Sequence, residues 1–227
     1  MMTRRDLLVT GLASLIMPRY IWANVTTKTR IFWPEFYSHM NRLADSFSKD
    51  ETHLLAVEEE CLAYLENLDV SDTTFINAVN EAYETGNQYW LWQRMIKQPN
   101  LNGGILTIES SQFVQLHDHP GATGILRVTS GEVEIWQFDE INEKNEITTL
   151  KRTSHRLLKA GDTAILKPSS GNIHALQAVS KECSMLDFFI PPYKRSQRSW
   201  YEPIDNAWFE KQEITCKKIS QQNYMDA

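Results

Sequence analysis

Two histidines stand one residue apart in the segment FVQLHDHPGA, residues 113–122. Side chains alternate across a β-strand, so His117 and His119 are expected to project from the same face. Asp118 between them points away, and we interpret it as structural or solvent-facing. Pro120-Gly121 then ends the strand. Two imidazoles near one point form a compact chelate for Zn, Fe, Ni or Cu, although two ordinary histidines at a rim would share this spacing.

A third histidine follows a turn in the segment KPSSGNIHAL. Together the two segments resemble the two sequence motifs of the cupin superfamily, including the glycine that follows the H-x-H pair, here Gly131. The Glu that would complete the usual four-ligand set falls on Gly124, which cannot ligate. The resemblance implies a mainly β chain with a cupin barrel (a double-stranded β-helix, or small jelly roll). It also implies a metal site with three ligands: His117, His119 and His174.

Three imidazole ligands have consequences of their own. A facial triad on Fe(II) normally includes a carboxylate, and three neutral ligands leave the ion its full charge. Such a centre favours an anionic, soft ligand such as a thiolate, and it leaves further positions for a substrate amine and O2. Zn with three histidines and a water, a hydrolytic site, satisfies the same ligand types.

Two longer motifs are more restrictive. HDHPG is one, and GNIHAL followed by CSMLDFFIPPY is the other. They resemble the plant cysteine oxidase and cysteamine dioxygenase family of thiol dioxygenases over residues 113–193. The resemblance implies a non-haem Fe(II) enzyme that oxidises a thiol to a sulfinic acid with O2. Its substrate would be a small aminothiol such as cysteamine or cysteine, or the N-terminal cysteine of a peptide. A non-catalytic metal-binding cupin, or a Zn, Mn or Ni hydrolase or isomerase, is the alternative.

The same resemblance implies two further site residues. Asp187 matches the family's acidic residue inside the barrel, and Tyr193 matches the tyrosine of its Pro-Pro-Tyr ending. Asp187 interrupts an apolar strand, where a carboxylate must be paired or hydrogen-bonded. It could hold a substrate ammonium or orient oxygen, or it could be structural, and Tyr193 could simply pack. The segment from His174 to Asp187 is one residue longer than the family pattern.

Residues 1–23 resemble an export signal. Arg4-Arg5 precedes a short apolar run, residues 7–17, and a plausible cleavage site lies before Asn24. The sequence TRRDLL resembles the twin-arginine motif, so we expect an exported, periplasmic protein. An N-terminal helix retained on a cytoplasmic protein is the alternative. The relatives that carry the motifs work inside cells, so the class of reaction transfers better than the substrate.

The rest of the chain divides into three segments. Helical periodicity predicts a helical region over residues 24–102, and its aromatic cluster YWLWQRM is interpreted as core. Short apolar runs separated by turns predict the barrel over residues 103–193, with hairpins at Ser130-Gly131 and Ala160-Gly161-Asp162. The charged stretch EINEKNEITTLKRTS is interpreted as a solvated loop. Residues 194–227 are a C-terminal extension that wraps the barrel.

Composition sets the remaining bounds. The 227 residues carry a formal net charge of −6 and no clustered basic face, so we expect no nucleic-acid partner. Three cysteines are too few for a disulfide framework. Outside the N-terminal signal, no segment is apolar and long enough to span a bilayer, so no stable membrane insertion is expected. The partners expected are a thiol substrate and O2, on a monomer.

Overall fold

The computed structural model describes residues 30–47, 54–86, 88–89 and 91–225. The predicted export signal, residues 1–23, lies outside the described residues. Within the described part of the chain, no helix combines the length and the apolar character needed to cross a bilayer.

Three helices precede the sheets: α1 (Trp33–Phe47), α2 (Leu54–Asn67) and α3 (Thr73–Glu84). In α1, Phe36, Met40 and Leu43 recur at helical spacing and are buried, as the sequence pattern predicts. The N-terminus of α3 is capped by Asp72, whose carboxylate accepts a hydrogen bond from the Thr74 amide at 2.8 Å.

The strands form two antiparallel sheets. The first has the order β1-β2-β3-β10-β5-β8. Its strands are β1 (Gln88–Tyr89), β2 (Trp92–Lys97), β3 (Asn102–Glu109), β10 (Glu182–Ile190), β5 (Thr123–Ser130) and β8 (Thr163–Leu166). The second closes on itself in the order β11-β12-β7-β6-β9-β4. Its strands are β11 (Ser199–Pro203), β12 (Glu213–Ser220), β7 (Ile147–Lys159), β6 (Glu132–Lys144), β9 (Ile173–Ala178) and β4 (Phe113–His117). A short helix, α4 (Gln221–Met225), follows β12.

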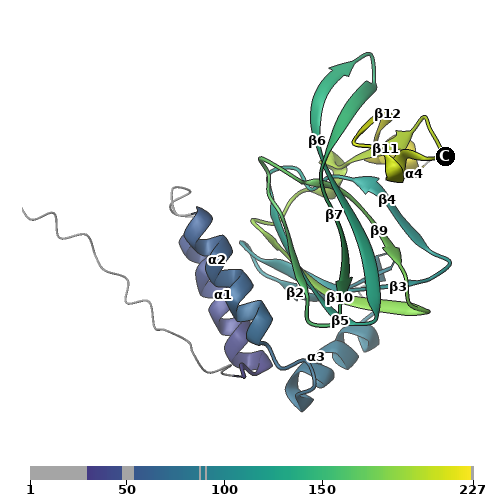
Figure 1. The fold of residues 1–227 in the computed structure, drawn as a ribbon. Helices are drawn as coiled ribbons and strands as arrows, with labels where there is room; N and C mark the ends of the chain where they lie inside the picture. The colour runs from purple at the N-terminus through teal and green to yellow at the C-terminus, as the bar shows by residue number, and fades with distance from the viewer. Residues whose placement is uncertain (1–29, 48–53, 87, 90, 226–227) are drawn as a thin grey trace, which may run out of the picture.

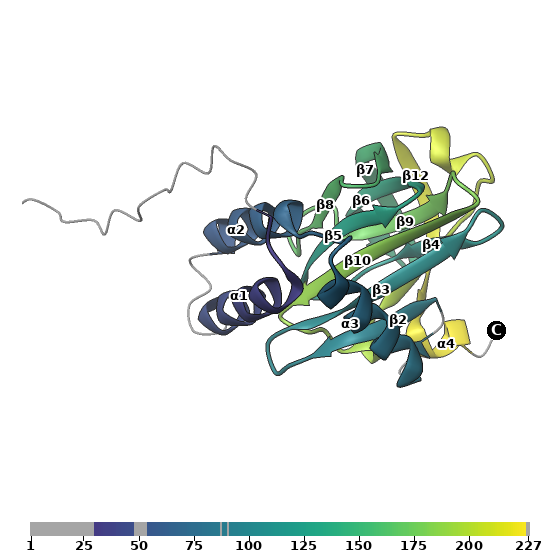
Figure 2. The same ribbon diagram turned by 90° about the horizontal axis from the view of Figure 1, so that it is seen from below.

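The helices cover the outer face of the first sheet, on one side of the molecule (Figures 1 and 2). The side chains of β10 point alternately toward the helices and toward the space between the two sheets. Leu186 and Phe188 belong to the core shared with the helices, where the rings of Phe36 and Phe188 lie 5.3 Å apart. Met185 and Asp187, on the opposite face of β10, line the interior between the sheets. The period of the strand thus points Asp187 inward.

A second hydrophobic core fills the space between the sheets. It combines Leu106 and Leu126 of the first sheet with Val133 and Leu176 of the second. Two such sheets packed face to face form the double-stranded β-helix, so the predicted mainly β cupin barrel with an N-terminal helical segment is confirmed.

The two predicted hairpins are wrong. Gly131 and Gly161 do occupy tight turns, with φ of +77° and +98°. However, Gly131 joins β5 to β6, and Gly161 joins β7 to β8, and in each case the two strands belong to different sheets. A turn sequence fixes where the chain reverses but not which strand becomes the partner, so each turn carries the chain from one sheet to the other.

Three segments have more β-structure than predicted. Residues 92–97, expected to be helical, form β2 and pair with β3, because periodicity cannot distinguish a helix from a strand in a short apolar run. The charged stretch 140–154, expected to be a loop, continues the β6–β7 ladder around a turn at Asn145-Glu146. Its outer part projects from the barrel with most side chains exposed (Figure 1), so no apolar alternation marks it. The C-terminal extension also contributes β11 and β12 to the closed sheet.

Candidate metal centre

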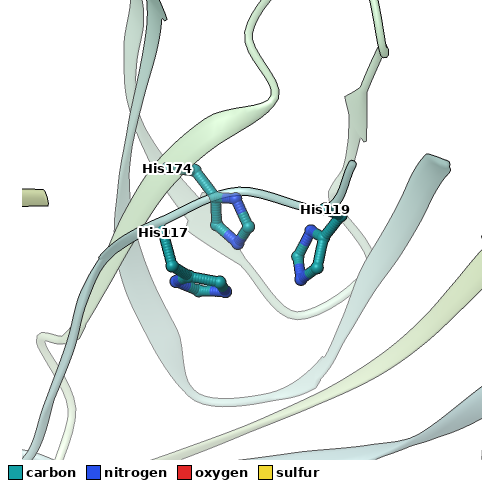
Figure 3. A group of neighbouring side chains, drawn as sticks. All are labelled: His117, His119 and His174. Atoms are coloured by element: carbon teal, nitrogen blue, oxygen red, sulfur yellow. The ribbon is translucent and has the colours of Figure 1, made fainter. Parts of the chain in front are cut away.

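Three histidines converge at one end of the barrel. His117 is the last residue of β4, and His119 follows it in the turn that begins there. His174, near the start of β9, is the register partner of His117 on the neighbouring strand. One potential ligand nitrogen from each ring lies within 4.8 Å of those of the other two. Figure 3 shows the three rings turned toward a common point. The three predicted ligands are therefore brought together.

Backbone and amide groups hold these rings. Nδ1 of His117 lies 2.7 Å from the Gln115 carbonyl, and Nδ1 of His174 lies 3.1 Å from the Asn172 carbonyl. A carbonyl can only accept, so each Nδ1 carries the proton and each Nε2 keeps its lone pair. Asn172 also binds the backbone of His119, accepting from its amide at 2.7 Å and donating to its carbonyl at 3.1 Å.

The electrostatics of the three rings suit a cation. Burial lowers the pKa of His117 and His119 well below the usual range, and it lowers the pKa of His174 to about 4. The rings are therefore neutral near pH 7, which is the form that binds a metal. Nδ1 of His119 is buried without a hydrogen-bond partner among the described residues. These residues fit a divalent metal ion, and among the described residues no Asp or Glu joins the group.

Neither Gly124, the position of the expected fourth ligand, nor Asp118 supplies a carboxylate to the group of three histidines. Gly124, where a fourth ligand would be expected, lines the same cavity as the histidines. Even a Cβ atom there would lie 2.9 Å from Cδ1 of Leu166. Asp118 points away from the site and accepts hydrogen bonds from the Ser199 amide at 2.7 Å and the Tyr201 hydroxyl at 3.3 Å. Asp118 is thus structural and ties the ligand turn to β11.

A small cavity of about 60 Å³ lies beside the three rings. Its walls come from both sheets and from the segment that follows β10. The charged side chains that line it are one carboxylate and two guanidiniums: Asp187, Arg195 and Arg198. The cavity therefore combines an apolar interior with a few charged groups, the usual character of a small-molecule site.

Asp187 projects into this cavity from β10. Its carboxylate accepts a hydrogen bond from the Trp92 indole nitrogen at 2.5 Å. Burial raises the pKa of Asp187 to about 7, although the Trp92 hydrogen bond opposes the shift. The β10–β5 ladder changes register between Ser184 and Met185, inside the segment that is one residue longer than the family pattern. Asp187 keeps its inward position beyond that irregularity.

Tyr193 lies against the metal-site histidines. Its ring centroid is 4.7 Å from that of His119, and its hydroxyl accepts a hydrogen bond from Arg198. Burial raises the pKa of the Tyr193 hydroxyl, so the group is a neutral phenol at physiological pH. Both residues predicted to accompany the histidines therefore line the same cavity.

Three further cavity residues were not identified from the sequence. Trp92 lies in the aromatic cluster interpreted as core, and Arg195 and Arg198 lie in the C-terminal extension expected to wrap the barrel. β2 forms a local hairpin with β3, and the pairing of β3 with β10 then brings Trp92 to Asp187. The pairing of β11 with β4 brings Arg198 to the histidines. The β3–β10 and β11–β4 pairings are long-range, and no local sequence signal specifies them.

The cysteines take no part in this site. Cys61, Cys183 and Cys216 are free and buried. Burial raises the pKa of all three thiols, to about 12, 11 and 12 respectively, so they are not thiolates at neutral pH.

The fold is a cupin barrel, and three of its histidines are placed so that they could hold one metal ion. The PCO_ADO family model matches residues 64–224, which is more than half of the chain. The chain belongs to this family, that of the plant cysteine oxidases and cysteamine dioxygenases.

Individual relatives are more distant. The 2-aminoethanethiol dioxygenase of Mus musculus is 27% identical over 112 residues, covering 40% of this chain and 44% of that protein. Plant cysteine oxidase 1 of Arabidopsis thaliana is 27% identical over 96 residues, covering 40% of this chain and 32% of that protein. The chain thus spans less than half the length of these curated relatives. A Klebsiella pneumoniae protein with a double-stranded β-helix domain is 21% identical, with a TM-score of 0.38, and the match covers 50% of this chain and 81% of that one.

Proposed function

We propose that the chain is a non-haem Fe(II)-dependent thiol dioxygenase that converts a thiol to its sulfinic acid with O2. The observation that carries the proposal is the group of three buried, neutral histidines without a carboxylate ligand. Membership of a family whose relatives are named thiol dioxygenases supports it. His117, His119 and His174 would hold the iron, which when bound brings the thiol and O2 together.

The other cavity residues would act on the substrate and its protons. Asp187, held by Trp92, is placed to accept from a substrate ammonium or to orient oxygen. Its raised pKa also lets it take up the thiol proton near neutral pH. The phenol of Tyr193, next to His119, can donate a hydrogen bond into the site. The apolar walls exclude bulk water from these groups.

The substrate we propose is a small aminothiol such as cysteamine or cysteine, or the N-terminal cysteine of a peptide. Two names among the relatives, 2-aminoethanethiol dioxygenase and plant cysteine oxidase, support a thiol of this kind. We further propose that the protein acts as a monomer in the periplasm, exported by the signal in residues 1–23.

The test uses the chain from Asn24 onward, loaded with Fe(II) under nitrogen. Cysteine, cysteamine, 3-mercaptopropionate and a peptide that begins with cysteine are supplied, air is admitted, and mass spectrometry follows the products. We expect a gain of two oxygen atoms on at least one thiol. No gain on any of them, with iron bound and the barrel folded, would overturn the proposal in favour of a metal-binding cupin or a hydrolase or isomerase that uses another metal.

A pair of histidine variants provides the internal control. His174→Ala should abolish oxygen uptake and lower the iron content. His155→Ala removes a histidine of β7 that stacks on Trp136, outside the cavity, and should leave both unchanged. Equal uptake by the two variants would contradict the assignment of His174 as a ligand.

A further inference from the structure

A buried tryptophan is hydrogen-bonded to the carboxylate of the cavity. Nε1 of Trp92 donates to Oδ1 of Asp187 at 2.5 Å, and both side chains line the cavity beside the three histidines. Trp92 is only 7% exposed, so its N–H group needs an acceptor inside the protein. A carboxylate has lone pairs on two oxygens, so this bond leaves Oδ2 with acceptor capacity for a group inside the cavity.

Trp92 reaches Asp187 across an intervening strand. β3 lies between β2 and β10, so the backbones of these two strands are about 9–10 Å apart. The residue of β3 that is level with Asp187 is Gly104. A Cβ atom on Gly104 would lie 2.5 Å from Cε2 of Trp92, so the indole lies directly over this glycine. The missing side chain at position 104 therefore lets a long side chain from β2 reach the carboxylate on β10.

Packing fixes the orientation of the indole. The guanidinium carbons of Arg195 and Arg94 lie 5.2 Å and 5.8 Å from the centroid of the Trp92 ring, within the range of cation–π contacts. Trp92 also belongs to the core between the sheets, together with Leu106, its register partner on β3. A donor that is held by its neighbours limits the directions that the Asp187 carboxylate can take.

Opposing effects act on the charge of Asp187. Burial raises its pKa to about 7, whereas the Trp92 hydrogen bond and the charges of Arg198 and Arg195 lower it. The phenol of Tyr193 and the three neutral histidines share the cavity. The register partners of Asp187 on the neighbouring strands carry no charge: Gly104 and Leu126. Among the described side chains, the indole of Trp92 is the hydrogen-bond donor that favours the carboxylate over the acid.

We infer that Trp92 is a positioning residue, which acts through Asp187 by holding one carboxylate oxygen so that the other faces the substrate beside the metal site. The inference rests on the proposed thiol dioxygenase function and adds a residue to it. Trp92 contributes the orientation of the carboxylate and favours its charged form. A group that accepts a proton or an ammonium loses both advantages when the N–H donor is removed.

A double-mutant cycle tests the inference with the iron-loaded chain. It compares wild type, Asp187→Asn, Trp92→Phe, which keeps an aromatic ring without the N–H, and the double variant. The substrate is the one of the four thiols named above that has the highest kcat/KM. We expect Trp92→Phe to lower kcat/KM about ten- to a hundredfold in wild type, the range for a hydrogen bond to a charged group, and less than about twofold in Asp187→Asn. Equal losses in the two backgrounds would show that Trp92 serves the packing alone and would overturn the inference.

The pH profile is a second readout, which a packing defect would not move. Activity should rise with pH as Asp187 ionises. Trp92→Phe should move this rise to higher pH by about one to two units, because the loss of a hydrogen bond to the charged form raises the pKa of the carboxyl group. Trp208→Phe removes the indole of a half-buried tryptophan outside the cavity and should leave the profile and kcat/KM unchanged. An unmoved midpoint in Trp92→Phe would overturn the inference.

An NMR titration separates the two possible failures, because it needs no turnover. In the metal-free chain with isotope-labelled indoles, the Trp92 signal should move as Asp187 ionises near pH 7, and Asp187→Asn should abolish this movement. The wild-type measurement keeps the inference testable if Trp92→Phe does not fold. A moving signal without oxidation of any thiol would refute the dioxygenase function while supporting the placement of Trp92. An indole signal that does not respond to Asp187 would overturn the inference and leave the dioxygenase function standing.

Discussion

Asp187→Asn should change how the stability of the protein depends on pH. The side chain is buried, and its pKa is raised from 3.8 to about 7 because burial disfavours the charged form. Asparagine has nearly the same shape and keeps an oxygen that can accept from Trp92. The substitution therefore removes the titration and preserves the packing.

The sign and the size of the effect follow from linkage. Between pH 3.8 and about pH 7 the folded chain keeps the Asp187 proton while the unfolded chain has lost it. The free energy of unfolding therefore falls as the pH rises through this window, and the loss is complete above the folded pKa. A difference of about three pKa units corresponds to at most about 4 kcal/mol.

The assay is urea unfolding of the metal-free chain between pH 4 and pH 8, followed by tryptophan fluorescence. Metal-free protein is used because a bound cation adds its own attraction for the carboxylate. Relative to wild type, Asp187→Asn should gain stability steadily as the pH rises from 4 to 7. Asp162→Asn, an exposed carboxylate that accepts from the Lys159 amide, is the matched control and should follow the wild-type curve. Parallel curves for wild type and Asp187→Asn would refute the reasoning.

Three further perturbations address other parts of the chain. Asn172→Ala should lower metal affinity about ten- to a hundredfold in a chelator competition, because Asn172 fixes the backbone of His119. Phe36→Ala should lower the free energy of unfolding by about 3–5 kcal/mol in a urea titration, because the ring is fully buried between α1 and β10, while the metal stoichiometry stays at wild-type values. Replacing Arg4-Arg5 by Lys-Lys should abolish export from a bacterium with a twin-arginine pathway, measured by cell fractionation.

Each of these predictions has a result that would contradict it. Wild-type metal affinity in Asn172→Ala, or the same loss in the exposed control Asn142→Ala, would show that Asn172 does not organise the ligands. A loss below about 1 kcal/mol for Phe36→Ala would be smaller than the removal of a buried aromatic ring allows. Equal periplasmic amounts of the Lys-Lys variant and the wild type would contradict twin-arginine export.

Local patterns predicted the parts of the site that depend on strand periodicity. The H-x-H spacing predicted that His117 and His119 lie near one point, although His119 lies just beyond the end of β4. An acidic residue in an apolar strand drew attention to Asp187. The barrel strands were predicted for the same reason, since short apolar runs and glycine turns are local features.

Long-range pairing is what the sequence could not supply. Trp92 reaches Asp187 across 95 positions, and Arg198 reaches the site because Trp200 pairs with His117 across 83 positions. No local motif specifies either contact. Trp92 is equally compatible with a place in the hydrophobic core, and Arg198 with a place on the surface. The β6–β7 ladder escaped prediction for a different reason. Its outer part has solvent on both faces, so polar residues occupy both alternating positions.

The pairing of β11 with β4 has a consequence for the order of events during synthesis. The three histidines leave the ribosome well before β11, yet β11 closes the sheet behind His117 and places Trp200 against its ring. Domains form as units, and pairings between distant segments are slow to form. An enclosed site therefore forms only after residues 199–220 have been made and have docked. A nascent chain that stops before β11 carries all three histidines but leaves the site open on the side of His117, so the enclosed site can form only after the C-terminal strands have docked.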